Sequence, residues 1–230
     1  MNNITEEFRA RPATSIVTAV LLFALIIAFI ASFLHFNWAG MIVIFLIILL
    51  ICLPRFVEKF SKIVVPAGIQ IFLICFTFAS LFLGDYNHYY SKYFWWDTVL
   101  HASSGLAFAI VGFLALYLIA NSSTLRVNPW TIAIFSFCFS LAIGAVWEIL
   151  EFTLDQMFGL NLQAGSLGQV NSLFDTMKDL IADACGALIA SLLGYFYLKK
   201  KRGSFVNPLM VEFKEDNPEL FKKKKAKYDD

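Results

Sequence analysis

Acidic side chains recur at helical spacing in the apolar stretch VWEILEFTLDQMFG, residues 146–159. Glu148, Glu151 and Asp155 lie at positions i, i+3 and i+7, and residues at this spacing share one face of a helix. A charged side chain at the centre of a bilayer costs about 2.5–3.5 kcal/mol on insertion scales. The stripe therefore predicts a polar cavity between helices rather than a surface that faces lipid.

Two further apolar stretches carry stripes of the same kind. Asp97 and His101 are four residues apart, and Asp175, Asp179 and Asp183 follow one another at intervals of four. Counted from the helix ends at about 1.5 Å per residue, the three stripes reach similar depths. Ionisable side chains inside a membrane avoid lipid by facing the interior of a bundle. We therefore expect the three stripes to face one another around one cavity that opens outward.

The cavity would hold more negative than positive charge. Its carboxylates are Asp85, Asp97, Glu148, Glu151, Asp155, Asp175, Asp179 and Asp183. The basic residues nearby are His88, Lys92, His101 and Lys178, too few to pair them all. Clustered carboxylates repel one another unless protons or cations neutralise them, so a bound cation is expected.

Carboxylate oxygens together with one imidazole are ligands that suit Zn, Mn, Fe or Mg. We therefore predict a divalent metal site whose ligands are Asp97, His101, Glu148, Asp179 and Asp183. Glu151 remains outside this set and is predicted to be the catalytic general base.

Several of these residues have simpler explanations, which stay open. Asp97 and Asp175 stand near helix starts, where Asp is a good N-cap. Asp155 can be a solvated helix end. His88, in an aromatic loop, and His35, at a tight turn, are interpreted as interfacial and structural residues.

Small residues follow His101 and Asp183 at helical spacing. Ser104 is interpreted as helix-packing filler, because small residues let membrane helices approach closely. Gly105 and Gly186 are predicted to mark such close contacts.

Composition places the whole chain in a membrane. Of its 230 residues 59% are hydrophobic and 15% are charged, whereas soluble domains average about 25% charged residues. A helix needs about 20 apolar residues to span a bilayer. Six stretches qualify, the second on the short side: 16–34, 41–53, 64–83, 100–120, 130–154 and 174–198. The predicted fold is all-α, a polytopic membrane protein with a bundle of six transmembrane helices.

The distribution of Lys and Arg predicts the orientation. With the N-terminus inside, the inner loops hold Arg9, Arg11, Arg55, Lys59, Lys62, Arg126, Lys199, Lys200, Lys201 and Arg202. The outer loops hold only Lys92 and Lys178. Because Lys and Arg accumulate in cytoplasmic loops, both termini are expected in the cytoplasm. The expected location of the protein is the inner cell membrane.

Three segments follow from this topology: a cytoplasmic N-terminal segment 1–13, a transmembrane domain 14–198 and a charged cytoplasmic tail 199–230. The lysines of the tail can rest on anionic lipid or remain in a solvated, disordered segment. The loop 156–172 is uncharged and is expected to lie over the outer helix ends. Membrane lipid is the expected partner, and nucleic acid is not.

Three motifs resemble a known family. WWDTVLHASSGLAFAIVG, WEILEFTLDQMFGLNLQ and DTMKDLIADACGALIAS are similar to the YjdF-like family of multi-pass prokaryotic membrane proteins, over residues 84–195. The resemblance implies a small polytopic inner-membrane protein and no particular activity. It carries over the motif positions Asp97, His101, Gly105, Glu148, Glu151, Asp175, Asp179, Asp183 and Gly186.

Three functions are compatible with this sequence. The first is a metal-dependent hydrolase that acts on a lipid or lipid-linked substrate, although HExxH and GxSxG motifs and an arginine near the cavity are missing. The second is an ion- or proton-coupled transporter, although the inner halves of the last three spans carry no charged residue. The third is an assembly protein with a structural cation site.

Overall fold

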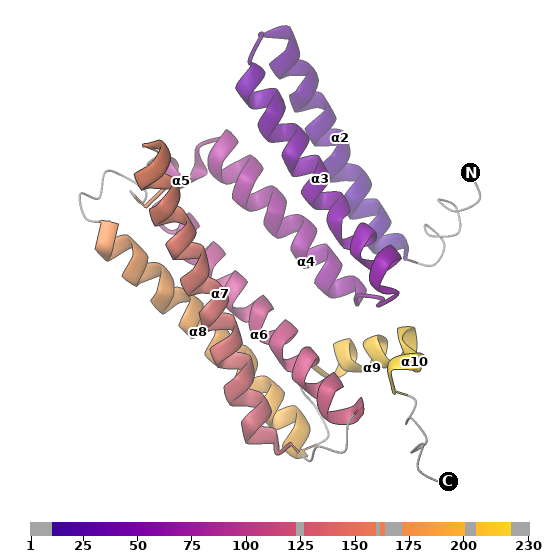
Figure 1. Cartoon of the computed structure of the whole chain (residues 1–230). Helices are drawn as coiled ribbons and strands as arrows, with labels where there is room; N and C mark the ends of the chain where they lie inside the picture. The colour runs from indigo at the N-terminus through magenta and orange to yellow at the C-terminus, as the bar shows by residue number, and fades with distance from the viewer. Residues whose placement is uncertain (1–10, 123–126, 160–161, 164–171, 201–205, 222–230) are drawn as a thin grey trace. The chain divides into compact units, whose positions relative to one another are not determined.

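The computed structural model describes residues 11–122, 127–159, 162–163, 172–200 and 206–221. All of their regular structure is helical (Figure 1). The helices are α2 Pro12–Leu34, α3 Trp38–Ser61, α4 Ala67–Thr77, the π-helix η1 Phe78–Tyr86, α5 Tyr89–Lys92, α6 Trp96–Ser122, α7 Pro129–Phe158, α8 Ser172–Lys200, α9 Val206–Asp216 and α10 Pro218–Phe221. Residues 1–10 of the predicted N-terminal segment, Arg126, most of loop 156–172 and the lysines from 222 onward lie outside the described residues.

Six helical segments are long and apolar enough to cross a membrane, which confirms the predicted fold class. They are Pro12–Leu34, Gly40–Ser61, Ala67–Tyr86, Trp96–Ala120, Pro129–Phe158 and Leu173–Lys199. The second is longer than the predicted 41–53, because α3 continues through Pro54. Proline removes one backbone donor and disturbs one turn without having to end a helix in a membrane. The helix ends at Ser61, and the residue that caps it, Lys62, has a left-handed conformation with φ 57°.

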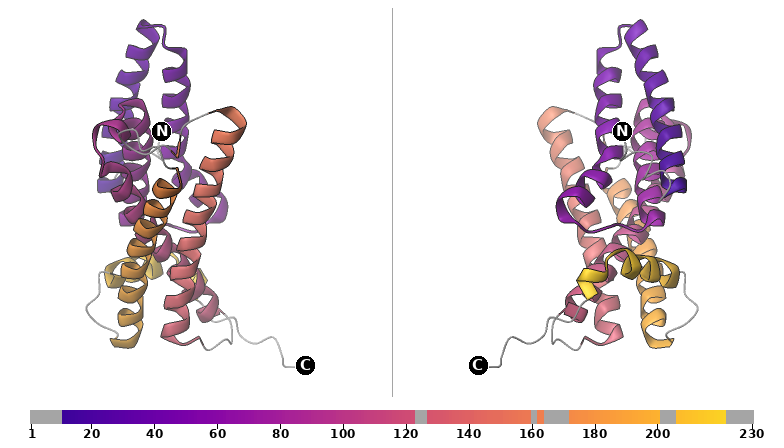
Figure 2. Two further views of the ribbon diagram at one scale, coloured as in Figure 1. Left: turned by 90° about the vertical axis from the view of Figure 1, so that its left-hand side faces the viewer. Right: turned by 90° about the vertical axis from the view of Figure 1, so that its right-hand side faces the viewer.

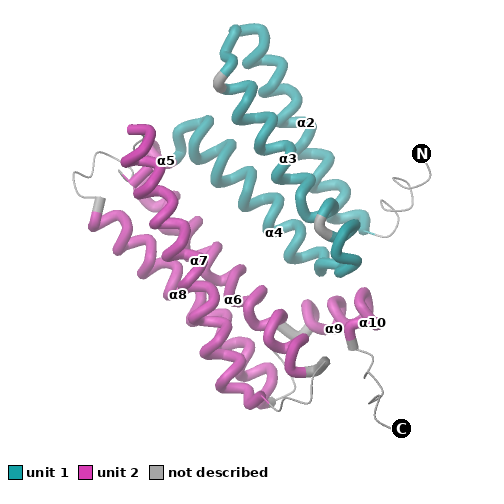
Figure 3. Tube along the Cα trace, viewed as in Figure 1, with its two compact units in different colours: residues 1–89 teal, residues 90–230 magenta. Residues whose placement is uncertain are grey.

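The chain divides into two compact units, residues 1–89 and 90–230 (Figure 3). In unit 1, α2 and α3 form an antiparallel hairpin and pack with α4 and η1. The core consists of Leu25, Ile44, Ile47, Ile51 and Ile74. At one end, the Glu58 carboxylate accepts hydrogen bonds from Arg11 and from Gln70, which joins the helices of this unit. The predicted boundaries 1–13, 14–198 and 199–230 stay a prediction.

Unit 2 is built on three mutually packed helices, α6, α7 and α8 (Figure 2). A methyl group at Gly105 of α6 would overlap the backbone carbonyl of Asp183, and one at Gly186 of α8 would overlap the carbonyl of Ala102. On the other side, the buried Ser140 of α7 donates a 2.6 Å hydrogen bond to the Gly105 carbonyl. Small residues therefore bring the three backbones together, as the two glycines predicted.

The tail contains helices that its composition did not indicate. Met210 and Phe213 of α9 are buried, and this helix contacts α8 while α10 contacts α6. The Lys214 ammonium lies 5.1 Å from the centre of the Tyr117 ring, a cation–π contact. Met210 and Phe213 are at i, i+3 spacing, so both lie on the buried face of α9.

Replacing Gly186 by Ala tests the close crossing of α6 and α8. Alanine has a helix propensity about 1 kcal/mol better than glycine, yet its methyl group would collide with a backbone oxygen that cannot turn away. We expect Gly186→Ala to lower the free energy of unfolding by about 1–3 kcal/mol, the usual cost of overpacking. Thermal unfolding in detergent measures it. The neighbouring, exposed Cys185→Ala is the control, and equal stability of both variants would contradict the crossing.

The orientation can be tested with two isosteric substitutions. Ser61 and Ser91 are exposed and stand on either side of the span Ala67–Tyr86. In a cysteine-free background, we expect a membrane-impermeant maleimide to label Ser91→Cys in intact cells, because Ser91 lies in a predicted outer loop. Ser61→Cys should react only after permeabilisation. The reverse pattern would invert the topology.

Candidate metal centre

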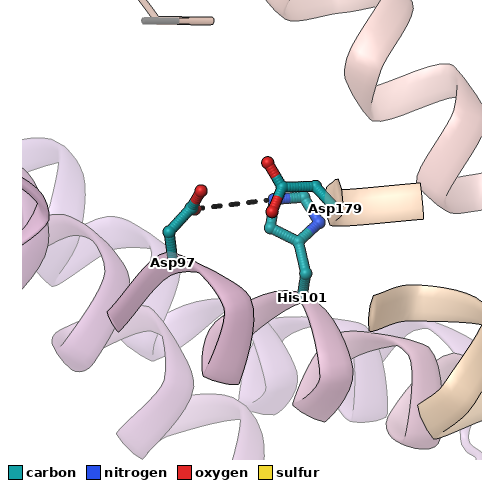
Figure 4. A group of neighbouring side chains, drawn as sticks. All are labelled: Asp97, His101 and Asp179. Atoms are coloured by element: carbon teal, nitrogen blue, oxygen red, sulfur yellow. Dashed lines mark ion pairs between the residues drawn. The ribbon is translucent and has the colours of Figure 1, made fainter. Parts of the chain in front are cut away.

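The structure brings the predicted stripes of α6, α7 and α8 together. Asp97 and His101 rise from α6, and Asp179 reaches them from α8 (Figure 4). One ligand atom from each of these three residues lies within 4.8 Å of the other two. This group of two carboxylates and one imidazole could hold a metal ion.

The two ring nitrogens of His101 face different partners. Nδ1 lies 3.3 Å from Asp183 Oδ2. Nε2 lies 3.7 Å from Asp97 Oδ1 and 4.0 Å from Glu148 Oε1. If Nδ1 carries the proton and donates a hydrogen bond to Asp183, Nε2 has a free lone pair on the side of Asp97 and Glu148. A carboxylate behind a histidine is the usual arrangement that orients a metal-binding imidazole.

Asp183 lies behind the imidazole, outside the group of three. It is 1% exposed, and the Ser104 hydroxyl lies 2.8 Å from its Oδ1 and 2.8 Å from the His101 carbonyl. A methyl group at Gly144 of α7 would overlap Asp183 Oδ2, so the glycine provides the space for this carboxylate. Ser104, interpreted from the sequence as filler, is therefore a hydrogen-bond donor to the cluster.

Glu148 brings a carboxylate to the cluster from the third helix. It is 5% exposed, and Asp179 is 2% exposed. Glu148 Oε1 and Asp179 Oδ1 are buried and have no hydrogen-bond partner among the described residues. Buried polar atoms are almost always satisfied, because leaving one unpaired costs free energy. Glu148 Oε1 therefore lies beside the His101 imidazole without a hydrogen-bond partner among the described residues, whereas Asp179 Oδ1 has the Lys178 ammonium 3.6 Å away.

Lys178 brings a positive charge to the aspartates of α6 and α8. Its Nζ lies 3.0 Å from Asp175 Oδ1, 3.4 Å from Asp97 Oδ2 and 3.6 Å from Asp179 Oδ1. One ammonium group is thus shared by three aspartates from two helices. From the sequence, Lys178 is only a basic residue near the cavity, because position 178 lies on a different face of α8 from Asp179. The long lysine side chain nevertheless reaches the carboxylate of Asp179.

Glu151 stands apart from the group of three. The Trp147 indole N–H donates a 2.9 Å hydrogen bond to Glu151 Oε1. Both side chains are on α7, one turn apart. This contact was not predicted from the sequence, although the i, i+4 spacing of the two residues makes it geometrically possible.

The Asp155 side chain binds the backbone of the residues that follow α7. Its carboxylate accepts hydrogen bonds from the backbone N–H groups of Leu162 and Gln163, at 2.8 and 3.0 Å. The Gln163 amide in turn donates to the Thr176 hydroxyl at 3.0 Å. These contacts join the end of α7 to the start of α8, which replaces the interpretation of Asp155 as a solvated helix end.

The two other histidines lie outside the group of three. His35 follows α2 in unit 1 and is exposed. His88 follows η1, is exposed and has a left-handed backbone with φ 59°. Neither residue therefore joins the candidate metal centre, and their structural and interfacial interpretations stay predictions.

Comparison with known proteins identifies related chains. Residues 13–200 match the model of a family described as predicted membrane protein, DUF2238. An uncharacterised protein of Thermotoga maritima is 30% identical over 153 residues, which cover 66% of this chain and 73% of that protein. No solved structure matches the chain.

Proposed function

This chain belongs to the DUF2238 family of predicted membrane proteins, and we propose that it is a membrane enzyme that uses a divalent cation to hydrolyse a lipid or lipid-linked substrate. The resemblance of its motifs to the YjdF-like proteins extends the proposal to a location in the inner cell membrane. Both termini are then cytoplasmic and the cavity opens outward, as the distribution of Lys and Arg predicts.

One observation carries the proposal. Asp97, His101 and Asp179 present ligand atoms within 4.8 Å of one another, and the buried Glu148 Oε1 beside them has no hydrogen-bond partner among the described residues. An acidic cluster alone would be weak support. A buried carboxylate oxygen that lacks a donor and lies next to an imidazole is the second, independent sign of a cation.

The donor set suits Zn, Mn, Fe or Mg. Asp97, His101, Asp179 and Glu148 would hold the ion. Asp183 would orient the imidazole of His101 through Nδ1, at 3.3 Å. In this assignment Asp183 acts through His101, which differs from the ligand role that the sequence predicted for it.

A bound divalent cation supplies Lewis-acid polarisation of the substrate and a more acidic water molecule. Glu151 would accept the proton of the attacking water, and the Trp147 N–H would hold its carboxylate in place. Hydrolysis joins the water oxygen to the phosphorus or acyl carbon of the substrate. The proton then passes to the oxygen that leaves. The side chains of His101, Glu148 and Asp179 are at most 11% exposed, and electrostatic effects are stronger where water is largely excluded.

Metal content is the first test. We expect purified full-length protein to contain about one equivalent of divalent cation by elemental analysis, because the cluster is otherwise poorly compensated. His101→Ala and Asp179→Asn should lose it. Asp183→Asn should lower affinity about 10–100-fold, the usual effect of a residue that orients a ligand. His35→Ala, in unit 1, is the control. Wild-type protein without a cation, and with a melting temperature that added Zn, Mn, Fe or Mg leaves unchanged, would refute the proposal.

Glu151→Gln separates catalysis from binding. Glutamine keeps the shape and the Trp147 contact but cannot accept a proton, so the variant should retain its cation and lose about 10²–10⁴-fold in turnover. The membrane lipids of cells that express the wild type are compared with those of cells that express Glu151→Gln, so that no substrate has to be chosen in advance. The substrate should accumulate only in the cells with the variant. Glu215→Gln, on the exposed side of α9, is the matched control. Identical lipid compositions, together with cation or proton flux in proteoliposomes, would instead support the transporter.

A further inference from the structure

An open groove lies between α6 and α8, beside the candidate metal centre. Its volume is about 430 Å³, within the range of small-molecule sites. The residues that matter here are Ala102 of α6 and Phe174, Met177, Lys178, Ile181 and Cys185 of α8. Apart from Lys178 and the Thr98 hydroxyl, the walls are apolar.

The groove and the metal centre occupy adjacent faces of the same two helices. On α6, Thr98 and Ala102 of the groove directly follow Asp97 and His101 of the centre. On α8, the groove residue Ala182 directly precedes Asp183. The two features therefore run at the same depth, because successive residues on a helix differ by only about 1.5 Å along its axis.

Lys178 belongs to both features. It lines the groove, and its ammonium is shared among Asp175, Asp97 and Asp179. A divalent cation held by Asp97 and Asp179 would neutralise two of these three aspartates. The ammonium would then keep its closest partner, Asp175 at 3.0 Å, and would have charge available for an anion. The flexible lysine stem lets it turn toward the groove.

We propose that the groove binds one acyl chain of an anionic phospholipid, whose phosphate pairs with Lys178. This inference rests on the proposed function and names its substrate class. Three features support this occupant: apolar walls, a single lysine among the lining residues at the junction with the metal centre, and exposed Phe174, Met177 and Ile181 along one side. An anion is complementary to the lysine, and a hydrocarbon chain is complementary to the walls. A phosphate at Lys178 would place the lipid ester bonds beside Asp179.

The test uses full-length protein in detergent and two photoreactive lipids. Phosphatidylglycerol and phosphatidylcholine each carry a diazirine in one acyl chain, and cross-linked peptides are identified by mass spectrometry. We expect phosphatidylglycerol to cross-link to residues 174–185 of α8 and to be displaced by unlabelled phosphatidylglycerol. The cation content of the same samples is measured in parallel.

Two pairs of variants locate the lipid. Cys185→Trp fills the groove and should reduce cross-linking about tenfold, a loss of ~1.4 kcal/mol in binding. Cys138→Trp, at an exposed position of α7 outside the groove, should not. Lys178→Gln should lower the preference for phosphatidylglycerol over phosphatidylcholine about fivefold, as expected for one lysine on an anionic lipid. Lys92→Gln removes an exposed charge at the same end of α6 and should keep the preference.

Several results would overturn the assignment. Equal cross-linking of both lipids by the wild type would refute the anionic headgroup. Cross-links confined to other helices, or a groove occupied by a second copy of the chain, would refute the lipid; if the protein still holds its cation, the proposed function stands. Cross-linking at α8 in protein that binds no cation would remove the proposed function and, with it, the role of this lipid as a substrate.

Discussion

The close approach of α6 and α8 is the constraint on which the rest of unit 2 depends. Gly105 lies against the backbone carbonyl of Asp183, and Gly186 lies against that of Ala102. Since neither contact leaves room for a side chain, the two helices cannot shift along each other without a collision. This fixes His101, one turn before Gly105, opposite Asp179 and Asp183. The Ser140 hydrogen bond to Gly105 then attaches α7 at the same level, which brings Glu148 to the cluster.

Charge balance explains the arrangement around this crossing. Carboxylates inside a membrane are costly unless they are paired, and the described part of unit 2 pairs most of them internally. Lys178 serves Asp97, Asp175 and Asp179, while Asp183 receives Ser104 and faces His101. The remaining oxygen of Glu148 has no donor. This oxygen and the group formed by Asp97, His101 and Asp179 are the observations on which the proposed cation site rests.

The same two helices also explain why a lipid groove can adjoin the site. A helix turns by about 100° per residue, so residues next to the acidic stripe in sequence face a neighbouring direction at the same depth. On α6 the residues that follow the stripe line the groove, and on α8 those that precede it do; apart from Thr98 and Lys178 they are apolar. Polar chemistry and a hydrocarbon chain can therefore meet at one level of the membrane.

The sequence by itself determined the six spans and the face of each helix that carries the acids, because length, hydropathy and helical spacing are local properties. It also indicated Gly105 and Gly186 as contact points. Only the tertiary structure decided that Asp183 stands behind His101, that Ser104 and Trp147 are hydrogen-bond donors, that Asp155 anchors backbone, and that Lys178 is shared by three aspartates. Spacing fixes the direction of a side chain about its own helix axis. It does not fix how neighbouring helices are rotated and separated, or how far a long side chain reaches across them.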